Sequence, residues 1–232
     1  MSIFKLKPAC KDYLWGGERL KKEYGIEYDG DPLAEAWVLS CHPDGLSVID
    51  SGEHKGKTLS EYIGRNADKT LGFPVLIKLI DAKQNLSIQV HPDDEYAMSH
   101  EGQKGKTEMW YILDSAPDAF IYYGFKKEIS KEEFEQRIRD NTITEVLNKV
   151  RVKKGEAYFI KAGTLHAIGA GCLIAEVQQN SNVTYRIYDY DRVGADGKRR
   201  ELHIDKALDV TDRRPPEPYK ADGDYLASCE YF

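Results

Sequence analysis

The sequence has little of what stabilises secreted or membrane-bound proteins. Its 232 residues include just four cysteines, Cys10, Cys41, Cys172 and Cys229, and no Cys-x-x-Cys pair. Scattered cysteines fit free thiols in a reducing compartment better than a disulfide framework. No stretch approaches the roughly 18 apolar residues of a membrane span, and residues 1–8 lack the apolar run of a signal peptide. We therefore expect a soluble, cytoplasmic protein that does not bind a membrane.

An excess of basic residues is also missing. The chain has 33 Lys and Arg against 39 Asp and Glu, which gives a net charge of -6. A surface that binds nucleic acid needs a basic patch or stripe, and the sequence contains none. We therefore expect no nucleic acid among the partners.

Helical patterns are few, and short β patterns dominate. A capping box at residues 130–133 predicts an amphipathic helix at about residues 131–140, and residues 58–63 favour a shorter one. The proline-rich run at 213–218 is expected to be a linker. Segments rich in β-branched and aromatic residues, separated by turn signals, predict strands. These are residues 35–40, 74–80, 109–113, 119–123, 157–160, 173–177 and 183–188.

One extended segment divides polar from apolar side chains. Gln89 and His91 are two residues apart, so a strand points both to one face. The apolar residues Leu86, Ile88 and Val90 then point to the opposite face. This alternation predicts a strand with one polar face and one apolar face.

Glu108 and His166 add two further metal-ligating side chains. Both lie in segments flanked by strand-forming residues, as expected if a barrel gathered distant strands around one centre. Two imidazoles and a carboxylate suit Zn(II) with an open position, and they equally suit Fe(II) in an oxygenase. In the alternative, structural interpretation, the histidines cap a strand or occupy a turn and the carboxylate faces solvent.

The spacing before His166 is more specific than the residue itself. Gly155, five residues, Lys161-Ala162-Gly163, two residues and His166 resemble the second cupin motif, in which proline usually stands at the position of Lys161. That motif forms a strand, a tight turn and a ligand entering the next strand, and glycine supplies the permissive backbone of the turn. We therefore predict a mainly β fold, a cupin-type jelly-roll barrel with a few short helices.

The similarity extends beyond a fold in four segments, at residues 86–94, 105–111, 162–168 and 185–190. Together with residues 15–17 and 34–37, and in the same order over almost the whole chain, they resemble the type I mannose-6-phosphate isomerases, specifically the short bacterial form. The resemblance implies a zinc-dependent aldose-ketose isomerase that interconverts mannose 6-phosphate and fructose 6-phosphate. Its partner is then a small sugar phosphate.

The resemblance also implies which residues hold the metal. It makes Gln89, His91, Glu108 and His166 the ligands of one Zn²⁺ per chain, in agreement with the set chosen on chemistry alone. Gln89 is the weakest member, because an amide is a poor zinc ligand and can instead hydrogen-bond a bound water.

Three further residues are implied in catalysis. Lys106, two residues before Glu108, is expected near the open metal position, where it shuttles or stabilises a proton. Glu176 matches a family carboxylate and is a candidate for the base. Arg186 is the cation expected to stabilise the negative charge of an enediolate. A salt bridge to Asp189 or Asp191 is the structural alternative for Arg186.

Recognition of the phosphate falls to residues away from the reacting carbons. Ser87, on the face of Gln89 and His91, resembles a phosphate contact of the family, and Lys78 is expected to assist. A lysine in a strand as apolar as residues 74–80 can also simply extend its ammonium to the surface. Asn182 replaces an aspartate that many relatives have, which weakens any charge-based role at that position.

The expected domain organisation has one departure from the family. Residues 1–212 are assigned to a catalytic cupin domain, and residues 213–232 to a linker and the opening strand of a second, smaller β domain that is otherwise missing. The oligomeric state is expected to be a monomer or a homodimer.

Two other function classes remain open at the level of sequence. A cupin oxygenase would use the same ligands with Fe(II), without phosphate donors. A non-catalytic or truncated cupin would bind the sugar phosphate without converting it.

Overall fold

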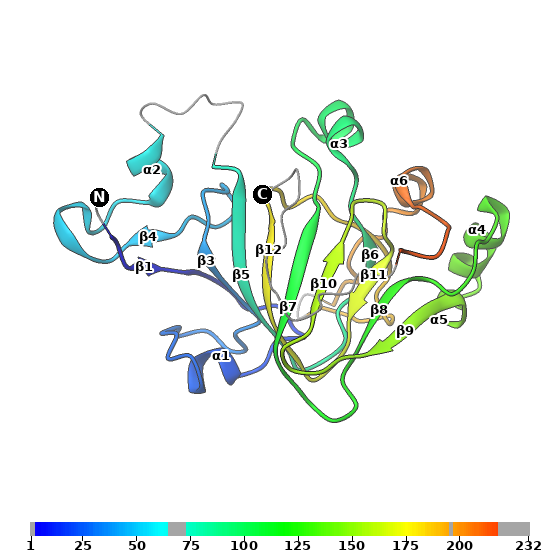
Figure 1. The fold of residues 1–232 in the computed structure, drawn as a ribbon, viewed down its shortest axis with the longest axis horizontal. Helices are drawn as coiled ribbons and strands as arrows, with labels where there is room; N and C mark the ends of the chain where they lie inside the picture. Colours follow the sequence, from blue (N-terminus) through cyan, green and yellow to red (C-terminus); the bar gives the residue numbers. More distant parts are fainter. Residues whose placement is uncertain (1–2, 65–72, 195–196, 218–232) are drawn as a thin grey trace.

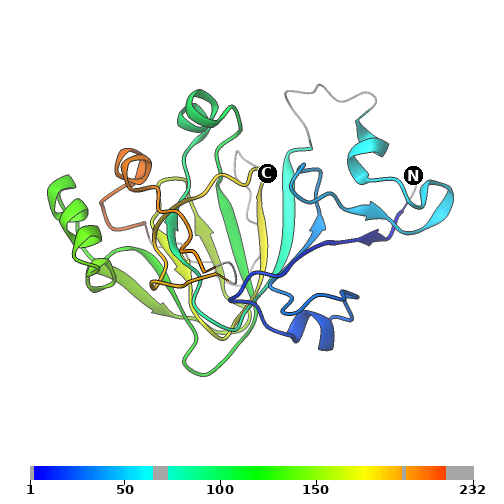
Figure 2. The same cartoon turned by 180° about the vertical axis from the view of Figure 1, so that it is seen from behind.

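Two antiparallel β-sheets pack face to face and form an open jelly-roll barrel of the cupin type (Figures 1 and 2). The computed structural model describes residues 3–64, 73–194 and 197–217. Within these residues the two sheets do not share a strand, so the barrel is open along its edges. This architecture confirms the predicted mainly β fold.

The larger sheet has six strands in the order β10-β7-β12-β5-β3-β2. Its central strands are the longest, because they carry β-branched and apolar residues in nearly unbroken runs. The strands are β2 (Ala9–Lys11), β3 (Glu35–Leu39), β5 (Val75–Ala82), β7 (Glu108–Ser115), β10 (Ala157–Ile160) and β12 (Cys172–Gln179).

The smaller sheet has five strands in the order β13-β6-β11-β8-β9. These are β6 (Ile88–Val90), β8 (Phe120–Phe125), β9 (Leu147–Arg151), β11 (His166–Ile168) and β13 (Tyr185–Tyr188). A separate two-stranded ribbon pairs β1 (Leu6–Lys7) with β4 (Val48–Ile49), at the end of the molecule that carries the N-terminus (Figure 1).

Short helices lie outside the sheets (Figure 1). Ser130 starts one of them, since its hydroxyl accepts a hydrogen bond from the Glu133 amide at 3.1 Å, as the capping box predicted. The helices are α1 (Arg19–Lys22), η1 (Gly52–His54), α2 (Leu59–Ile63), α3 (Asp94–Glu101), α4 (Lys131–Arg139), α5 (Ile143–Val146) and α6 (Ile204–Val210). None of the described helices is long and apolar enough to cross a membrane.

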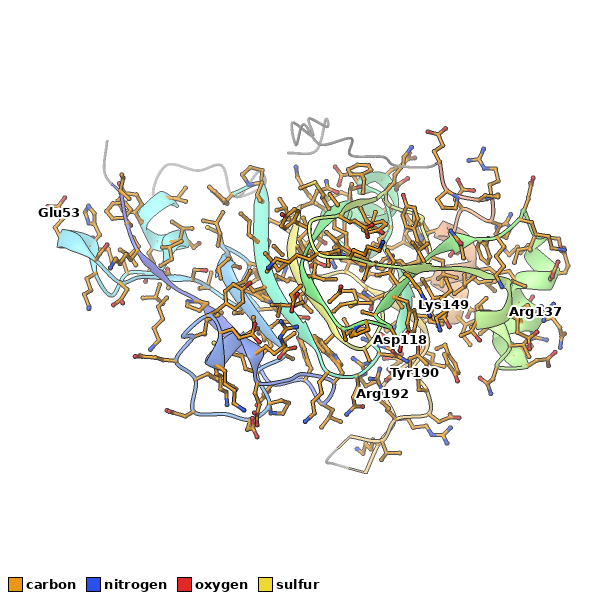
Figure 3. All side chains as sticks on the ribbon, turned by 60° about the horizontal axis from the view of Figure 1, so that its bottom comes forward. Glu53, Asp118, Arg137, Lys149, Tyr190 and Arg192 are labelled. Carbon is orange, nitrogen blue, oxygen red and sulfur yellow. The ribbon has the colours of Figure 1, made fainter. Side chains whose placement is uncertain are left out.

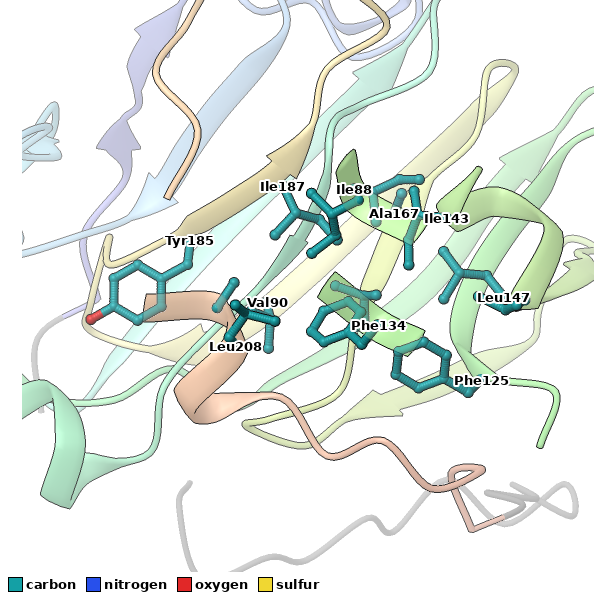
Figure 4. Packing of buried hydrophobic residues seen from close by; sticks show 14 of the residues in the cluster. Ile88, Val90, Phe125, Phe134, Ile143, Leu147, Ala167, Tyr185, Ile187 and Leu208 are labelled. Carbon is teal, nitrogen blue, oxygen red and sulfur yellow. The ribbon is translucent and has the colours of Figure 1, made fainter. Parts of the chain in front are cut away.

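The five-stranded sheet has an apolar cluster on each side. Inside the barrel, its residues Ile121 and Ile168 meet Ile80, Ile112 and Ile174 of the six-stranded sheet. On the outer face, α4, α5 and α6 cover a second cluster (Figure 4). This outer cluster includes Ile88, Val90, Phe125, Phe134, Ile143, Ala167, Tyr185 and Leu208. Two packed layers therefore fix the sheet on both sides.

The predicted strands and both predicted helices are confirmed within about two residues at either end. Ile88 and Val90 face the outer cluster and Gln89 faces the interior, as the alternation predicted. The prediction for Leu86 is wrong: it precedes β6, which begins at Ile88, and its side chain lines the interior cavity. Outside regular strand geometry, alternation no longer sets the direction of a side chain.

Residues 213–217 form no helix or strand, as the proline-rich run predicted, and their role as a linker stays a prediction. They pack against β8 and the segment after it: Pro216 contacts Gly124 of β8, and the Ile129 amide, beyond the end of β8, donates to the Arg213 carbonyl. The expected second domain falls on residues 218–232, which lie outside the described residues.

Candidate functional site

A row of four side chains crosses the six-stranded sheet at right angles to its strands. Trp37 on β3 is paired with Lys78 on β5, Lys78 with Glu176 on β12, and Glu176 with Trp110 on β7. Residues directly opposite one another in a sheet point to the same face. The row therefore places a lysine and a glutamate together inside the barrel, between two tryptophans.

A second row crosses the five-stranded sheet, which faces the first (Figure 1). Arg186 on β13 is paired with Gln89 on β6, and Gln89 with His166 on β11. All members of the two rows except Trp37 line one cavity of about 310 Å³. The strand register thus gathers an arginine, an amide and an imidazole opposite a lysine and a glutamate.

His91, Glu108 and His166 form a buried cluster at the inner end of this cavity. Their potential ligand atoms all lie within 4.8 Å of one another. The Nε2 atom of His91 is 3.4 Å from one carboxylate oxygen of Glu108, and the Nε2 atom of His166 is 3.5 Å from the other. The three side chains are each about 1% exposed.

The hydrogen bonds of the two imidazoles leave lone pairs directed at Glu108. The Nδ1 atom of His91 is 2.8 Å from the Val183 carbonyl, and that of His166 is 2.8 Å from the Thr164 carbonyl. A carbonyl accepts, so Nδ1 carries the proton in both rings and Nε2 is a bare acceptor. This is the arrangement of histidines that ligate a metal.

Two acceptors are left facing one another without a donor. Among the described residues, Glu108 Oε1 and His166 Nε2 are buried and lack a hydrogen-bond partner. Burying unpartnered acceptors is unfavourable unless a cation lies between them. The donor set therefore fits a divalent metal ion.

The electrostatics of the cluster agree with this fit. Burial lowers the pKa of His91 to about 3, with a further contribution from Lys106. Burial also lowers the pKa of His166. Burial alone would raise the pKa of Glu108, but the nearby charge of Lys106 opposes burial, and the pKa lies well below its ordinary value. Neutral imidazoles and an ionised carboxylate are the protonation states that bind metal.

Lys106 and Gln89 adjoin the cluster. The Lys106 ammonium is 2.9 Å from Glu108 Oε2 and 3.1 Å from His91 Nε2, close to the ligands as expected. Gln89 lies beside His166 in the strand register, and its Oε1 atom accepts a hydrogen bond from Ser87 at 3.2 Å. Metal ligation by Gln89 stays a prediction.

Glu176 and Lys78 form a buried ion pair at 3.2 Å. Glu35, at 3.8 Å from the same ammonium, is a second partner of Lys78. The indole of Trp110 donates to the other Glu176 oxygen at 2.9 Å, which fixes the carboxylate. Burial, together with the charge of Glu108, raises the pKa of Glu176. Lys78 is 4% exposed and held by two carboxylates, so contact with a phosphate stays a prediction that this pairing disfavours.

Arg186 lines the cavity with no carboxylate partner among the described residues. Its Nε atom donates to the Ser87 hydroxyl at 3.3 Å, and Nη1 donates to the Glu201 carbonyl at 3.1 Å. The alternative of a salt bridge to Asp189 is wrong, because Asp189 pairs with Arg192 and Arg200.

Asp191, the other carboxylate suggested for Arg186, pairs instead with Arg199 at 2.8 Å. Burial and the nearby charge of Arg200 lower the pKa of Arg186. A half-buried guanidinium without a counter-ion is suited to receive an anionic ligand.

The cavity also includes residues that the sequence did not single out. Tyr13, Glu35 and Arg200 contribute to its lining. Arg200 stands in charged surroundings that are typical of a solvated segment, so composition gave no signal for it. Glu35 is a single carboxylate in the apolar segment 33–39, and that isolated charge was the available signal. Gly163 adopts φ of 84°, as the cupin-like turn requires, and its amide donates to the His91 carbonyl at 2.8 Å.

Comparison with known proteins assigns the chain to a family. Residues 3–130 match the family described as phosphomannose isomerase type I, catalytic domain. The chain belongs to the type I phosphomannose isomerases. The mannose-6-phosphate isomerase of Streptococcus mutans serotype c is 43% identical over 202 residues, which cover 85% of this chain and 64% of that protein. The mannose-6-phosphate isomerase ManA of Bacillus subtilis is 45% identical over 211 residues, which cover 88% of this chain and 66% of that protein.

The fold comparison agrees with this family. The crystal structure of mannose 6-phosphate isomerase from Bacillus subtilis matches with a TM-score of 0.89 and 40% identity, and the match covers 94% of this chain and 71% of that one. This type I phosphomannose isomerase chain spans about two thirds of the length of the curated relatives it matches.

Proposed function

We propose that this chain interconverts mannose 6-phosphate and fructose 6-phosphate and holds one zinc ion. The observation that carries the proposal is the buried cluster of His91, Glu108 and His166, which opens into a cavity containing the Glu176 carboxylate and the Arg186 guanidinium. The names of its relatives, mannose-6-phosphate isomerases at 43–45% identity, support the substrate.

His91, Glu108 and His166, joined by Gln89, would hold the zinc ion. Two imidazoles and a carboxylate with an open position form a common donor set of catalytic zinc. When bound, the ion supplies a Lewis acid that stabilises negative charge on the substrate oxygens.

The reaction itself needs a base that moves a proton between adjacent carbons. A proton leaves the carbon next to a carbonyl, a cis-enediolate forms, and the proton returns to the neighbouring carbon. Glu176 is our candidate for this base. Its raised pKa suits a group that must both accept and release a proton, and the Trp110 indole holds it in place.

Positive charge stabilises the enediolate as it forms. Arg186 provides a fixed guanidinium on the opposite sheet from Glu176, and Ser87 orients it. Lys106, beside Glu108, is placed to stabilise or transfer a proton near the substrate oxygens. Lys78 keeps the Glu176 carboxylate oriented through their ion pair.

A coupled assay on the purified chain tests the proposal. Mannose 6-phosphate is supplied, fructose 6-phosphate is detected enzymatically, and the metal content is measured before and after treatment with a chelator. We expect turnover that is lost with the metal and restored by Zn²⁺. Bound iron with oxygen uptake would instead indicate a cupin oxygenase, and sugar phosphate binding without product would indicate a binding protein.

A further inference from the structure

Three arginines and one buried carboxylate meet at the outer end of the cavity. Asp189 accepts from Arg200 twice, at 2.7 Å from Nε and 2.6 Å from Nη2, and it also pairs with Arg192. Arg186 lies beside them, since its Nη1 atom bonds the carbonyl of Glu201, the neighbour of Arg200. Among the described residues, Asp189 is the one carboxylate that pairs with Arg192 and Arg200, and Arg186 pairs with none. The cluster therefore carries excess positive charge.

The cluster is at the entrance, whereas the metal ligands are at the inner end. The side chain of Arg200 is 37% exposed, against 1% for His166. Arg200 lines both the cavity of the site and an adjoining cavity with Tyr13, Trp15 and Asp189. Arg200 is therefore within reach of a ligand that occupies either cavity.

Arg192 and Arg200 differ in how much of the guanidinium is free. Arg192 donates to the Asn85 carbonyl at 2.6 Å and to Asp189, and it lies over the Tyr190 ring at 5.4 Å (Figure 3). Arg200 uses Nε and Nη2 on Asp189, while its Nη1 has no hydrogen-bond partner in the described part of the chain. Arg192 therefore has a structural role, whereas the Nη1 group of Arg200 is available to donate to a ligand in the cavity.

We propose that Arg200 binds the anionic end of the substrate, a phosphate monoester, while Asp189 positions its guanidinium. The inference rests on the proposed function, which puts the reacting carbons at the metal ligands and the phosphate at the far end of the sugar. A guanidinium is well matched to phosphate oxygens, because its planar donors form charge-assisted hydrogen bonds. The Ser87 hydroxyl donates to Gln89 at 3.2 Å, so Ser87 lies nearer than Arg200 to the residues that would hold the metal.

The test replaces Arg200 and compares a neighbour of equal charge. Arg200→Met is expected to raise KM for mannose 6-phosphate about 10- to 100-fold, the loss typical of a hydrogen bond to a charged group. We expect kcat to change less than about threefold, which is within the usual variation of such effects between sites. Arg199→Met is the control, because Arg199 pairs with Asp191 at the surface and its side chain is 68% exposed. We expect wild-type KM in the control. An equal rise in both variants would overturn the proposal, since it would reflect general surface charge.

Binding of inorganic phosphate separates this proposal from the proposed function. Calorimetric titration with phosphate needs no turnover, and Arg200→Met should weaken that binding by the same factor. A chain that isomerises nothing, yet loses phosphate affinity in Arg200→Met alone, would refute the proposed function and support the anion site. Unchanged phosphate affinity and unchanged KM would overturn the anion site.

Arg200→Lys guards against a folding defect. It keeps the positive charge but loses the two-point pairing with Asp189, so we expect KM between those of the wild type and Arg200→Met. Circular dichroism establishes that the variants are folded. A lysine variant as impaired as a folded Arg200→Met would support recognition by the planar guanidinium, whereas a lysine variant with more severe loss would contradict the proposal.

Discussion

The two faces of the five-stranded sheet are built by the same strands and obey different rules. On β6, Ile88 and Val90 face the helices α4 to α6, while Gln89 between them faces the cavity. On β13, Tyr185 and Ile187 pack in the outer cluster, while Arg186 faces inward. Alternating directions along a strand thus separate packing from chemistry by one residue.

The outer face is stabilised by burial of apolar area, which depends on volume and shape. The inner face instead borders an interior that buries charges from the opposite side of the barrel, namely Glu108, Lys106 and Glu176, each below 5% exposure. Buried charges stabilise a fold only when they are paired, and paired charges do not in general exceed apolar packing in stability. The polar interior is therefore not explained by stability and fits the proposed function, whereas the outer face holds that interior in place.

Between the polar interior and the apolar outer face, the largest loss of turnover is expected when one of the residues that would hold the metal is replaced. His166→Ala and Glu108→Ala should abolish measurable turnover and remove bound zinc, because each supplies one donor of a three-residue cluster. Atomic absorption on the purified variants measures the metal. His100→Ala is the control, since His100 lies exposed on α3. Zinc at full occupancy in either ligand variant would contradict the assignment.

Removal of the inward-facing arginine should separate chemistry from metal binding. Arg186→Ala is expected to keep zinc and to lose about 100- to 1,000-fold in kcat, as for other donors that stabilise developing negative charge. Arg151→Ala, at an exposed ion pair with Asp118, is the matched control with normal kcat. Near-normal turnover in Arg186→Ala would refute its role.

The pH dependence of kcat/KM should reflect the ion pair between Lys78 and Glu176. Glu176 must be ionised to accept a proton, and its pKa is raised above the ordinary 4.5, so kcat/KM should fall about tenfold per pH unit below that raised pKa. Lys78 lowers this pKa, so Lys78→Met should move the acid limb to higher pH.

The pH profile of Lys149→Met provides the comparison, because Lys149 is exposed on β9. Its acid limb should coincide with that of the wild type. An unshifted limb in Lys78→Met would show that Glu176 is not the group that titrates.

The smallest effect on turnover is expected on the outer face. Ile88→Val should lower the free energy of unfolding by about 0.5–1.5 kcal/mol and leave kcat unchanged. Gln89→Leu, one residue away on the inner face, should do the reverse: little loss of stability and a clear loss of kcat. Urea unfolding and steady-state kinetics on both variants measure the contrast. Equal effects of the two substitutions on kcat would contradict the division between an outer face for packing and an inner face for chemistry.

The sequence predicts the strands well, because alternation and turn residues are local signals. Helices were harder. α3 was not predicted because its residues are mostly polar and give no apolar periodicity, although Asp93 caps its start by accepting from the Tyr96 amide at 2.9 Å. α6 was missed because it has no side-chain cap, and tertiary packing of Ala207 and Leu208 holds it.

The grouping of His91, Glu108 and His166 was also predictable, because two imidazoles and a carboxylate in strand-like segments, with a specific spacing before His166, suit a metal site. The partners of those ligands were not. That Lys78 pairs with Glu176 depends on the register of β5 and β12, and the place of Arg200 depends on the segment beside β13. Register between distant strands is fixed by the whole core, so no local pattern encodes it.

The row from Trp37 through Lys78 and Glu176 to Trp110 has a consequence for how this chain can change in length. One inserted or deleted residue in β5, β7 or β12 would turn the side chains beyond it to the opposite face of the sheet. The row would then no longer form. Insertions are compatible with the site in exposed connections, such as residues 126–128 ahead of α4. The length of these strands is therefore as strict a requirement of this site as the identity of its residues.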